Sequence, residues 1–238
     1  MDLINFTSKI QEECKKINVN LEAEQIEQFY TYMQELIEWN NKINLTAIIE
    51  PEEIIKKHFI DCLSIIKYIK DDNKIIDVGT GAGFPGIPIK IANKSLNITL
   101  LDSLNKRISF LNEIITKLKL SNIETVHARA EEYAANGKRE KYDIAVSRAV
   151  ANLPTLLEYL MPYVKVNGIC ICMKGPKAQA ELEESKKAIE ILGGRLEKIE
   201  NIKIDENMDR NIIIIRKIKN TPNTYPRKAG KPGREPIK

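Results

Sequence analysis

The stretch DVGTGAGFPG, residues 77–86, decides the fold of this chain. It overlaps the end of KIIDVG, residues 74–79, an apolar run with the length and composition of a buried strand, and it opens a helix. Gly79, Gly81 and Gly83 let the backbone turn tightly and approach a ligand closely. The first turn of the following helix points free N–H groups at the same place. The sequence therefore predicts a ligand site at the carboxyl edge of an open α/β sheet.

Strands and helices alternate after this loop, which is typical of a parallel sheet with helices on both faces. Two last strands, near 196–204 and 211–218, have no helix between them, so one strand should be antiparallel. The predicted fold class is α/β, a doubly wound, Rossmann-like sheet of about seven strands, mostly parallel with one antiparallel strand. The other expected elements are strands near 97–102, 123–128, 142–147 and 168–173, and helices at 104–119, 153–163 and 177–192.

Helical spacing precedes the sheet, and basic, proline-containing sequence follows it. Apolar residues recur at helical spacing over 3–17 and from about 21 to 39, with Asn20 as the expected N-cap. Pro51 is expected to open a third helix. The C-terminal prolines predict an extended or irregular end. The resulting division is an N-terminal helical cap at 1–72, an α/β domain at 73–218 and a basic tail at 219–238.

The spacing of the glycines separates two classes of nucleotide-like cofactor. A dinucleotide site has the pattern G-x-G-x-x-G, and here its third glycine would fall on Phe84. The pattern present, D-x-G-x-G-x-G, resembles motif I of the class I methyltransferases, which bind S-adenosyl-L-methionine. Asp77 or backbone carbonyls would then hold the ammonium group of the cofactor. An NAD-dependent oxidoreductase remains an alternative at this stage.

Residues at the ends of the next two strands indicate a nucleoside site. Asp102 ends the second strand about 20 residues beyond the glycines, where a carboxylate can accept both ribose hydroxyls. This acid serves NAD and S-adenosyl-L-methionine equally, so it indicates the fold more than the ligand. Ser103 is expected to cap the next helix. Ala130 and Glu131, after the third strand, would lie beside the adenine.

The segment after the fourth strand, SRAVANLP at 147–154, bears on the methyl acceptor. Amino-group methyltransferases of nucleic acids resemble (N/D)PP(Y/F) there, and cytosine-C5 enzymes need a nucleophilic cysteine after a proline; the chain has neither. Cys170 and Cys172 alternate with isoleucines and are expected in the core. A ring nitrogen with a free lone pair, such as guanine N7, needs no general base. We therefore assign no catalytic side chain.

Four charged side chains have both a functional and a structural interpretation. Arg148, at the end of the fourth strand, would contact the cofactor or the base, or would pair with a loop acid. Lys174, after the fifth strand, would contact RNA or be an ordinary surface lysine. His58 and Asp61 are about one helical turn apart and are expected to pair on the helix surface, where they would support the cap or the substrate side, with structural use favoured over catalysis.

Composition and charge limit the class of protein further. The 238 residues are 43% hydrophobic and 29% charged, which is typical of a globular domain. We expect a cytoplasmic protein because no apolar run approaches the roughly 20 residues that span a bilayer and the N-terminus lacks secretory features. Four cysteines without zinc spacing predict reduced thiols and no metal site.

The positive charge is concentrated near the C-terminus. Net charge is +4 overall, but residues 216–238 hold eight basic residues and one acidic residue, a net +7 that leaves −3 for the rest. A basic tail on a slightly acidic body favours a polyanionic partner. A solvated tail that keeps the protein soluble is the alternative.

Several segments together resemble one family, the bacterial small-subunit rRNA guanine-N7 methyltransferases called RsmG or GidB. The resemblance implies a class I methyltransferase fold and methylation of a guanine N7 in a loop of 16S rRNA near the decoding site. Cys62 and Thr80 stand where the family commonly has serine. The matching segments are NKINLTAI (41–48), HFIDCLS (58–64), DVGTGAGFPG (77–86), VHARAEE (126–132), SRAVANL (147–153), MKG (173–175) and YPRKAGKPG (225–233).

The resemblance also implies roles for particular residues. The implied cofactor contacts are Gly79, Phe84, Ala130, Glu131 and Arg148, with Asp102 and Ser103 at the ribose. The candidate RNA contacts are Lys174, Arg227, Lys228, Lys231 and Arg234. The expected partner is small-subunit rRNA or the small ribosomal subunit, bound by a monomer, and removing 225–238 should weaken RNA binding with little effect on the cofactor. A non-catalytic ribosome-assembly factor and a methyltransferase for a small molecule or another RNA are the remaining alternatives.

Overall fold

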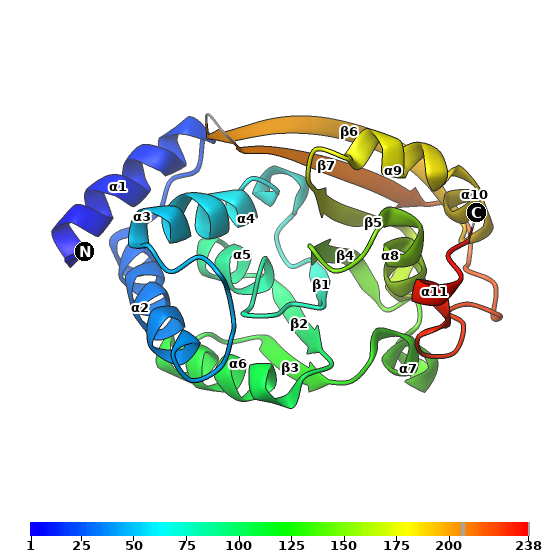
Figure 1. The fold of residues 1–238 in the computed structure, drawn as a ribbon, viewed down its shortest axis with the longest axis horizontal. Coiled ribbons are helices and arrows are strands. Elements are labelled where there is room, and N and C mark those ends of the chain that lie inside the picture. Colours follow the sequence, from blue (N-terminus) through cyan, green and yellow to red (C-terminus); the bar gives the residue numbers. More distant parts are fainter. Residues whose placement is uncertain (206–207, 238) are drawn as a thin grey trace.

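In the part of the chain that the computed structural model describes, residues 1–205 and 208–237, seven strands form one sheet (Figure 1). Their order is β3-β2-β1-β4-β5-β7-β6. The first five run parallel, and β7 pairs antiparallel with both β5 and β6. The predicted fold class is confirmed, with the antiparallel strand placed inside the sheet, beside its last member. The strands are β1 Lys74–Val78, β2 Asn97–Asp102, β3 Ile123–His127, β4 Tyr142–Arg148, β5 Val164–Lys174, β6 Gly194–Asp205 and β7 Met208–Lys217.

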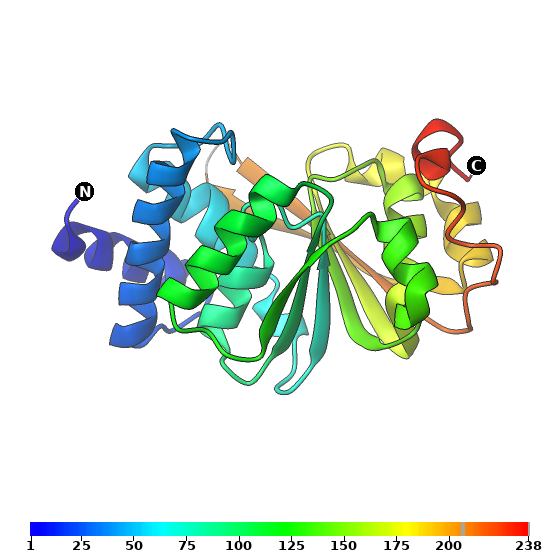
Figure 2. The same ribbon diagram turned by 90° about the horizontal axis from the view of Figure 1, so that it is seen from below.

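Helices cover both faces of the sheet, which Figure 2 shows nearly edge-on. The first face carries α5, α6 and the N-terminal helices, and the second carries α8, α9 and α10. Each central strand sends alternate side chains into the two cores, as Ile75 and Ile76 of β1 do. Cys170 and Cys172 are fully buried in the second core, as expected. The helices are α1 Leu3–Lys16, α2 Ala23–Asn40, α3 Pro51–Ile54, α4 Asp61–Leu63, α5 Gly86–Ala92, α6 Asn105–Lys117, α7 Ala130–Tyr133, α8 Leu153–Leu160, α9 Ala178–Glu184, α10 Lys186–Ile191 and α11 Lys231–Arg234.

The N-terminal helices pack directly on the sheet domain through α5 and α6. The side-chain amide of Gln25 donates to the carbonyl of Ile91 at 2.8 Å, which ties α2 to the end of α5. The expected N-cap at Asn20 is wrong, because α2 begins later. Glu22 and Gln25 form a capping box there, in which the Glu22 N–H donates to the Gln25 side chain at 2.8 Å.

Three helices differ from the sequence expectation in continuity. Pro51 opens α3 as predicted, and the chain continues through a π-helical turn, Ile55–Ile60, into α4. The helix expected at 177–192 is interrupted at Ser185, whose buried hydroxyl donates to the carbonyl of Glu181 at 2.6 Å. The helix expected at 153–163 ends as a 3-10 turn. No helix in the described ranges is both long and apolar enough to cross a membrane.

Candidate active site

The loop between β1 and α5 presents its backbone at the carboxyl edge of the sheet. Gly79, Gly81 and Gly83 have φ angles of +70°, +62° and +97°, in the left-handed region that favours glycine. The Gly79 N–H donates to the carbonyl of Leu101 at 2.8 Å, which joins the loop to β2. A Cβ on Gly79 would lie 2.5 Å from Cγ2 of Val150. The absence of a side chain at Gly79 therefore allows the loop after β4 to approach.

A cavity lies at the carboxyl ends of β1, β2 and β3. It brings together five predicted cofactor residues, namely Gly79, Asp102, Ser103, Ala130 and Glu131. The rest of its lining consists of Val78, Leu101, Ala128, Arg129, Val150, Tyr159 and Gly230. A mostly apolar wall with a few fixed polar groups is the usual character of a small-molecule site.

The other five predicted cofactor residues, Asp77, Gly81, Gly83, Phe84 and Arg148, do not line this cavity. Asp77 is fully buried beneath the glycine loop. Its Oδ2 accepts hydrogen bonds from the Thr80 hydroxyl at 2.6 Å and the Gly86 N–H at 2.8 Å, and burial raises the pKa of this carboxyl to about 7. These contacts favour a role for Asp77 in shaping the loop over contact with an ammonium group.

Asp102 ends β2 with its carboxylate held by three donors. Oδ1 accepts the Leu104 N–H at 2.9 Å, and Oδ2 accepts the Gly81 N–H at 2.9 Å and Nη1 of Arg107 at 3.2 Å. The prediction that Ser103 caps α6 is wrong: Leu104 is at the N-cap position without a side-chain cap. The Asp102 carboxylate takes the N–H there instead. Asp102 therefore joins the glycine loop, α6 and the cavity.

Glu131, in the first turn of α7, meets the C-terminal tail. Its side chain is buried, and Oε1 accepts the Gly230 N–H at 3.0 Å. Because Gly230 also lines the cavity, the tail forms part of the cavity wall. This position argues against the expectation that tail removal has little effect on the cofactor.

The tail packs against α8 rather than extending into solvent (Figure 1). Apart from α11 it is irregular, as expected. Arg227 holds it through Glu158 of α8, whose side chain is fully buried: Nε donates to Oε1 at 2.9 Å and Nη2 to Oε2 at 2.6 Å. The Thr155 hydroxyl donates to the carbonyl of Pro232 at 3.1 Å. The tail is therefore docked on the domain, and whether its exposed charges serve solubility or a polyanionic partner stays open.

Two of the five candidate RNA contacts are already engaged within the protein. Lys174 is 8% exposed, and its Nζ lies 2.7 Å from a carboxylate oxygen of Glu181. The alternative of an ordinary surface lysine is therefore wrong, because Lys174 is buried and pairs with an acid on α9, while its contact with RNA stays a prediction. Arg227 is engaged with Glu158 in the same way. The other three candidates, Lys228, Lys231 and Arg234, are exposed.

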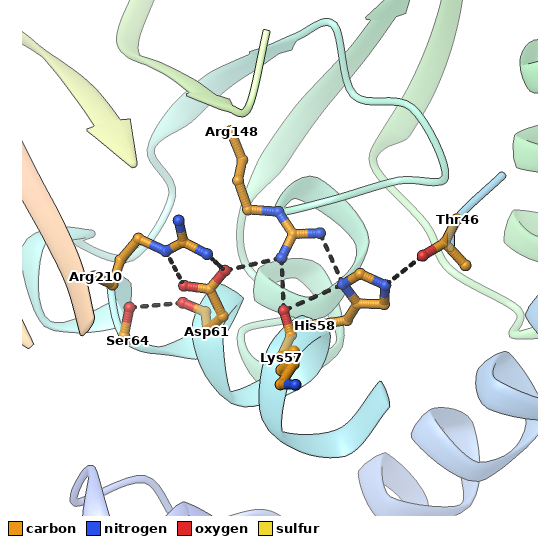
Figure 3. Close-up of polar contacts among 7 residues, drawn as sticks. All are labelled: Thr46, Lys57, His58, Asp61, Ser64, Arg148 and Arg210. Atoms are coloured by element: carbon orange, nitrogen blue, oxygen red, sulfur yellow. Dashed lines mark hydrogen bonds and ion pairs between the residues drawn. The ribbon is translucent and has the colours of Figure 1, made fainter. Parts of the chain in front are cut away.

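Arg148 enters a buried polar cluster formed with the N-terminal helices (Figure 3). Its Nη1 donates to Asp61 Oδ2 at 2.9 Å and to the carbonyl of Lys57 at 3.0 Å. Arg210 of β7 donates to the same carboxylate at 2.7 and 2.6 Å. Asp61 is fully buried, so the expected surface pair of His58 and Asp61 is wrong. Arg148 pairs with an acid, as one interpretation held, but the acid belongs to a helix.

His58 completes this cluster as a neutral ring. Burial and the Arg148 charge lower the pKa of His58 to about 3. Nδ1 lies 3.1 Å from Nη2 of Arg148 and 3.2 Å from the carbonyl oxygen of Lys57, and Nε2 lies 2.8 Å from the Thr46 hydroxyl. The ring stacks on Phe84 with centroids 4.5 Å apart. The Phe84 side chain therefore packs the glycine loop against the N-terminal helices.

Sequence reasoning missed several residues of this region. Val150 and Gly230 line the cavity and lie within the matching segments SRAVANL and YPRKAGKPG, but neither was singled out, and Tyr159 lies in no motif. Arg107 follows Asp102 by five residues on the first turn of α6, and that spacing was the one local signal available. Arg210 had none, because its partner Asp61 lies 149 residues away.

Strand order, the glycine loop and the acid at the end of β2 define a class I methyltransferase fold. A TYW2 protein of Pyrococcus horikoshii, solved in complex with MeSAdo, matches with a TM-score of 0.56 at 16% identity, over 67% of this chain and 62% of that one. A precorrin-6y C5,15-methyltransferase of Geobacter metallireducens matches with a TM-score of 0.51 at 17% identity, over 74% and 92% of the two chains. At such identities these likenesses establish the fold alone.

The family is established by sequence. Residues 25–213 match the model of the rRNA small subunit methyltransferase G family, and the chain belongs to that family. A ribosomal RNA small subunit methyltransferase G of Acetivibrio thermocellus is 57% identical over 92% of this chain and 91% of its own length. One from Clostridium tetani is 52% identical over 94% and 96%. The resemblance inferred from the motifs is confirmed.

Proposed function

We propose that this protein transfers a methyl group from S-adenosyl-L-methionine to N7 of a guanine in a loop of 16S ribosomal RNA. Family membership supports the reaction class, since the curated relatives are named as small-subunit rRNA methyltransferases. The observation that carries the proposal is the cavity in which the Gly79 backbone and the Asp102 carboxylate meet at the carboxyl ends of β1 and β2. A backbone turn and a carboxylate in these positions are the groups that hold a nucleoside-containing cofactor in open α/β sheets.

The lining of the cavity fits this cofactor. Asp102 retains one free acceptor position for a ribose hydroxyl, and Ala130 and Glu131 offer an apolar and a polar surface for the adenine. Gly79 leaves backbone exposed where a side chain would fill the space. When bound, S-adenosyl-L-methionine supplies an electrophilic methyl group on a sulfonium. Asp77 and Phe84 do not line the cavity and would support cofactor binding indirectly, by holding the glycine loop in place.

The acceptor explains why the site needs no assigned general base. Guanine N7 has a free lone pair and no proton, so no proton has to leave for the bond to form. The protein's own residues then align the base with the methyl group and exclude water. Alignment alone can contribute roughly 7–11 kcal/mol to lowering the barrier.

The RNA would meet the same edge of the sheet. Lys228, Lys231 and Arg234 are exposed on the tail segment that forms the Gly230 wall, so phosphates bound there would lie near the cavity. We further propose that the enzyme acts as a monomer in the cytoplasm, on the RNA within the small ribosomal subunit.

Incubation with labelled cofactor and unmodified small subunits tests the proposal, followed by mapping of the modified base. We expect label on a single guanine of 16S RNA, as N7-methylguanine, with its loss in Asp102→Ala. Transfer to another atom would refute the acceptor assignment, and no affinity for S-adenosylhomocysteine would refute the cofactor assignment. Arg195→Met, on the exposed face of edge strand β6, is the matched control and should leave transfer unchanged.

A further inference from the structure

A second groove, of about 630 Å³, lies between the α2–α3 loop and the start of α6. Arg107 lines it, and the same side chain donates to Asp102, which lines the cofactor cavity. The Arg107 guanidinium therefore connects the groove with the cofactor cavity. The groove and the cofactor cavity share no lining residue among those described.

The character of the groove suits a phosphodiester segment. Lys42, Lys106 and Arg107 line it, and no acidic residue is among the described residues of its lining. Lys42 pairs with Glu38, but both side chains are more than half exposed, so this pair is weak. Leu104 is 52% exposed and gives the groove an apolar surface for a base. Cations beside an exposed apolar side chain match single-stranded RNA.

The Asp102 carboxylate cannot satisfy all its partners at once. A carboxylate offers about four acceptor positions, and three are taken by the Gly81 N–H, the Leu104 N–H and Arg107. Two ribose hydroxyls would therefore find one position free. The two N–H groups are fixed in the glycine loop and at the start of α6, whereas Arg107 is a flexible side chain, one-third exposed, with the longest of the three bonds, 3.2 Å. Arg107 is therefore the donor that can leave the Asp102 carboxylate when the ribose binds.

We propose that ribose binding at Asp102 releases Arg107 into this groove, where its guanidinium, together with Lys106, binds a phosphate of the substrate RNA. The inference rests on the proposed function, because it takes the ribose of the cofactor as the ligand of Asp102. Loss of the Asp102 contact leaves the Arg107 charge uncompensated at the groove, so the groove attracts a phosphate more strongly once the cofactor is present. By linkage, RNA strengthens cofactor binding by the same factor.

The test measures this coupling on the full-length protein. S-adenosylhomocysteine is titrated with and without unmethylated small subunits, and subunit affinity is measured with and without saturating S-adenosylhomocysteine. We expect each ligand to strengthen binding of the other by about 5-fold or more. Arg107→Met, which keeps the length of the side chain but has no donor, should abolish the coupling. It should bind S-adenosylhomocysteine alone at least as tightly as the wild type and lower the salt slope of RNA binding by about 1.

Two further variants sharpen the result. Lys106→Met should weaken subunit binding but keep the coupling, because Lys106 makes no bond to Asp102. Arg195→Met, on the opposite edge of the sheet, should change nothing. Coupling that persists in Arg107→Met, or wild-type protein that binds both ligands without coupling, overturns this inference alone. Wild-type protein that does not bind S-adenosylhomocysteine overturns the proposed function as well.

Discussion

The ion pair between Arg227 and Glu158 should control cofactor affinity, although Arg227 does not line the cavity. Arg227→Ala removes a guanidinium that donates through two nitrogens to a fully buried carboxylate. Removal of one partner of a buried ion pair lowers the stability of the folded state by about 3–5 kcal/mol. The tail can avoid that cost by detaching from α8, because water then reaches Glu158. We therefore expect the equilibrium constant for docking of the tail to fall at least 100-fold, since 1.4 kcal/mol corresponds to about tenfold.

Detachment of the tail removes Gly230 from the cavity. Glu131 then loses the N–H that it accepts at 3.0 Å. Because Gly230 and Glu131 both line the cavity, their separation removes part of its wall, and the Kd for S-adenosylhomocysteine should rise. Calorimetric titration measures this affinity, and trypsin cleavage after Lys228 reports whether the tail has detached.

Lys219→Ala is the matched control, because it removes a positive charge from an exposed position in the same segment. It should leave both readouts unchanged. An Arg227→Ala protein whose tail is cleaved rapidly, but which binds S-adenosylhomocysteine like the wild type, would refute the role of the Gly230 wall. A tail that stays protected in that variant would refute the role of the ion pair in docking.

Four further predictions follow from the same geometry. Asp102→Ala should weaken S-adenosylhomocysteine binding by about tenfold or more, because the ribose loses a charged acceptor; calorimetry showing unchanged affinity would contradict the ribose assignment. Gly79→Ala should lower the melting temperature and cofactor affinity, since φ is +70° and the added Cβ meets a side chain at 2.5 Å; a melting curve like the wild type's would argue against that strain. The pKa of His58, about 3, lies below the ordinary value of 6.5. The unfolded chain therefore binds the proton first, and stability should be full above pH 6.5 and decline as pH falls toward 3; an imidazole NMR signal that titrates near 6.5 would refute this. Deleting the tail should reduce the slope of log RNA affinity against log salt by about 2, if three phosphates are bound there; a change near zero would exclude the tail from RNA binding. The three side chains expected to bind these phosphates are Lys228, Lys231 and Arg234.

The fold could be predicted because its signals are local. Each parallel strand is a short apolar run, and each helix has its own periodicity, so the type of each element and the succession of elements along the chain follow from short segments. Boundaries were missed where side chains decide them: Gln25 reaches back to Glu22 and sets the start of α2, and Ser185 interrupts the helix between α9 and α10. The glycine loop and Asp102 were located for the same reason, since the motif and the strand ends lie close in sequence.

Contacts between distant segments set the rest of the site, and no local pattern encodes them. Arg148 lies at the strand end where a cofactor contact is expected, but Asp61, 87 residues earlier, occupies its guanidinium. Gly230 reaches Glu131 across 99 residues. A sequence shows which residues carry charge, but only the fold shows which charges are already paired.

The basic tail shows how much this difference matters. Counting residues 216–238 gives a net +7 and suggests a continuous polycation. In the folded chain Arg216 pairs with Glu197, Arg227 pairs with Glu158, and buried Lys217 donates to a backbone carbonyl and to the Thr221 hydroxyl. The exposed charge that remains on the docked tail is concentrated around α11, on the segment that also lines the cavity. The tail is therefore better described as part of the wall of the candidate active site, carrying a few cations, than as a flexible arm that binds RNA.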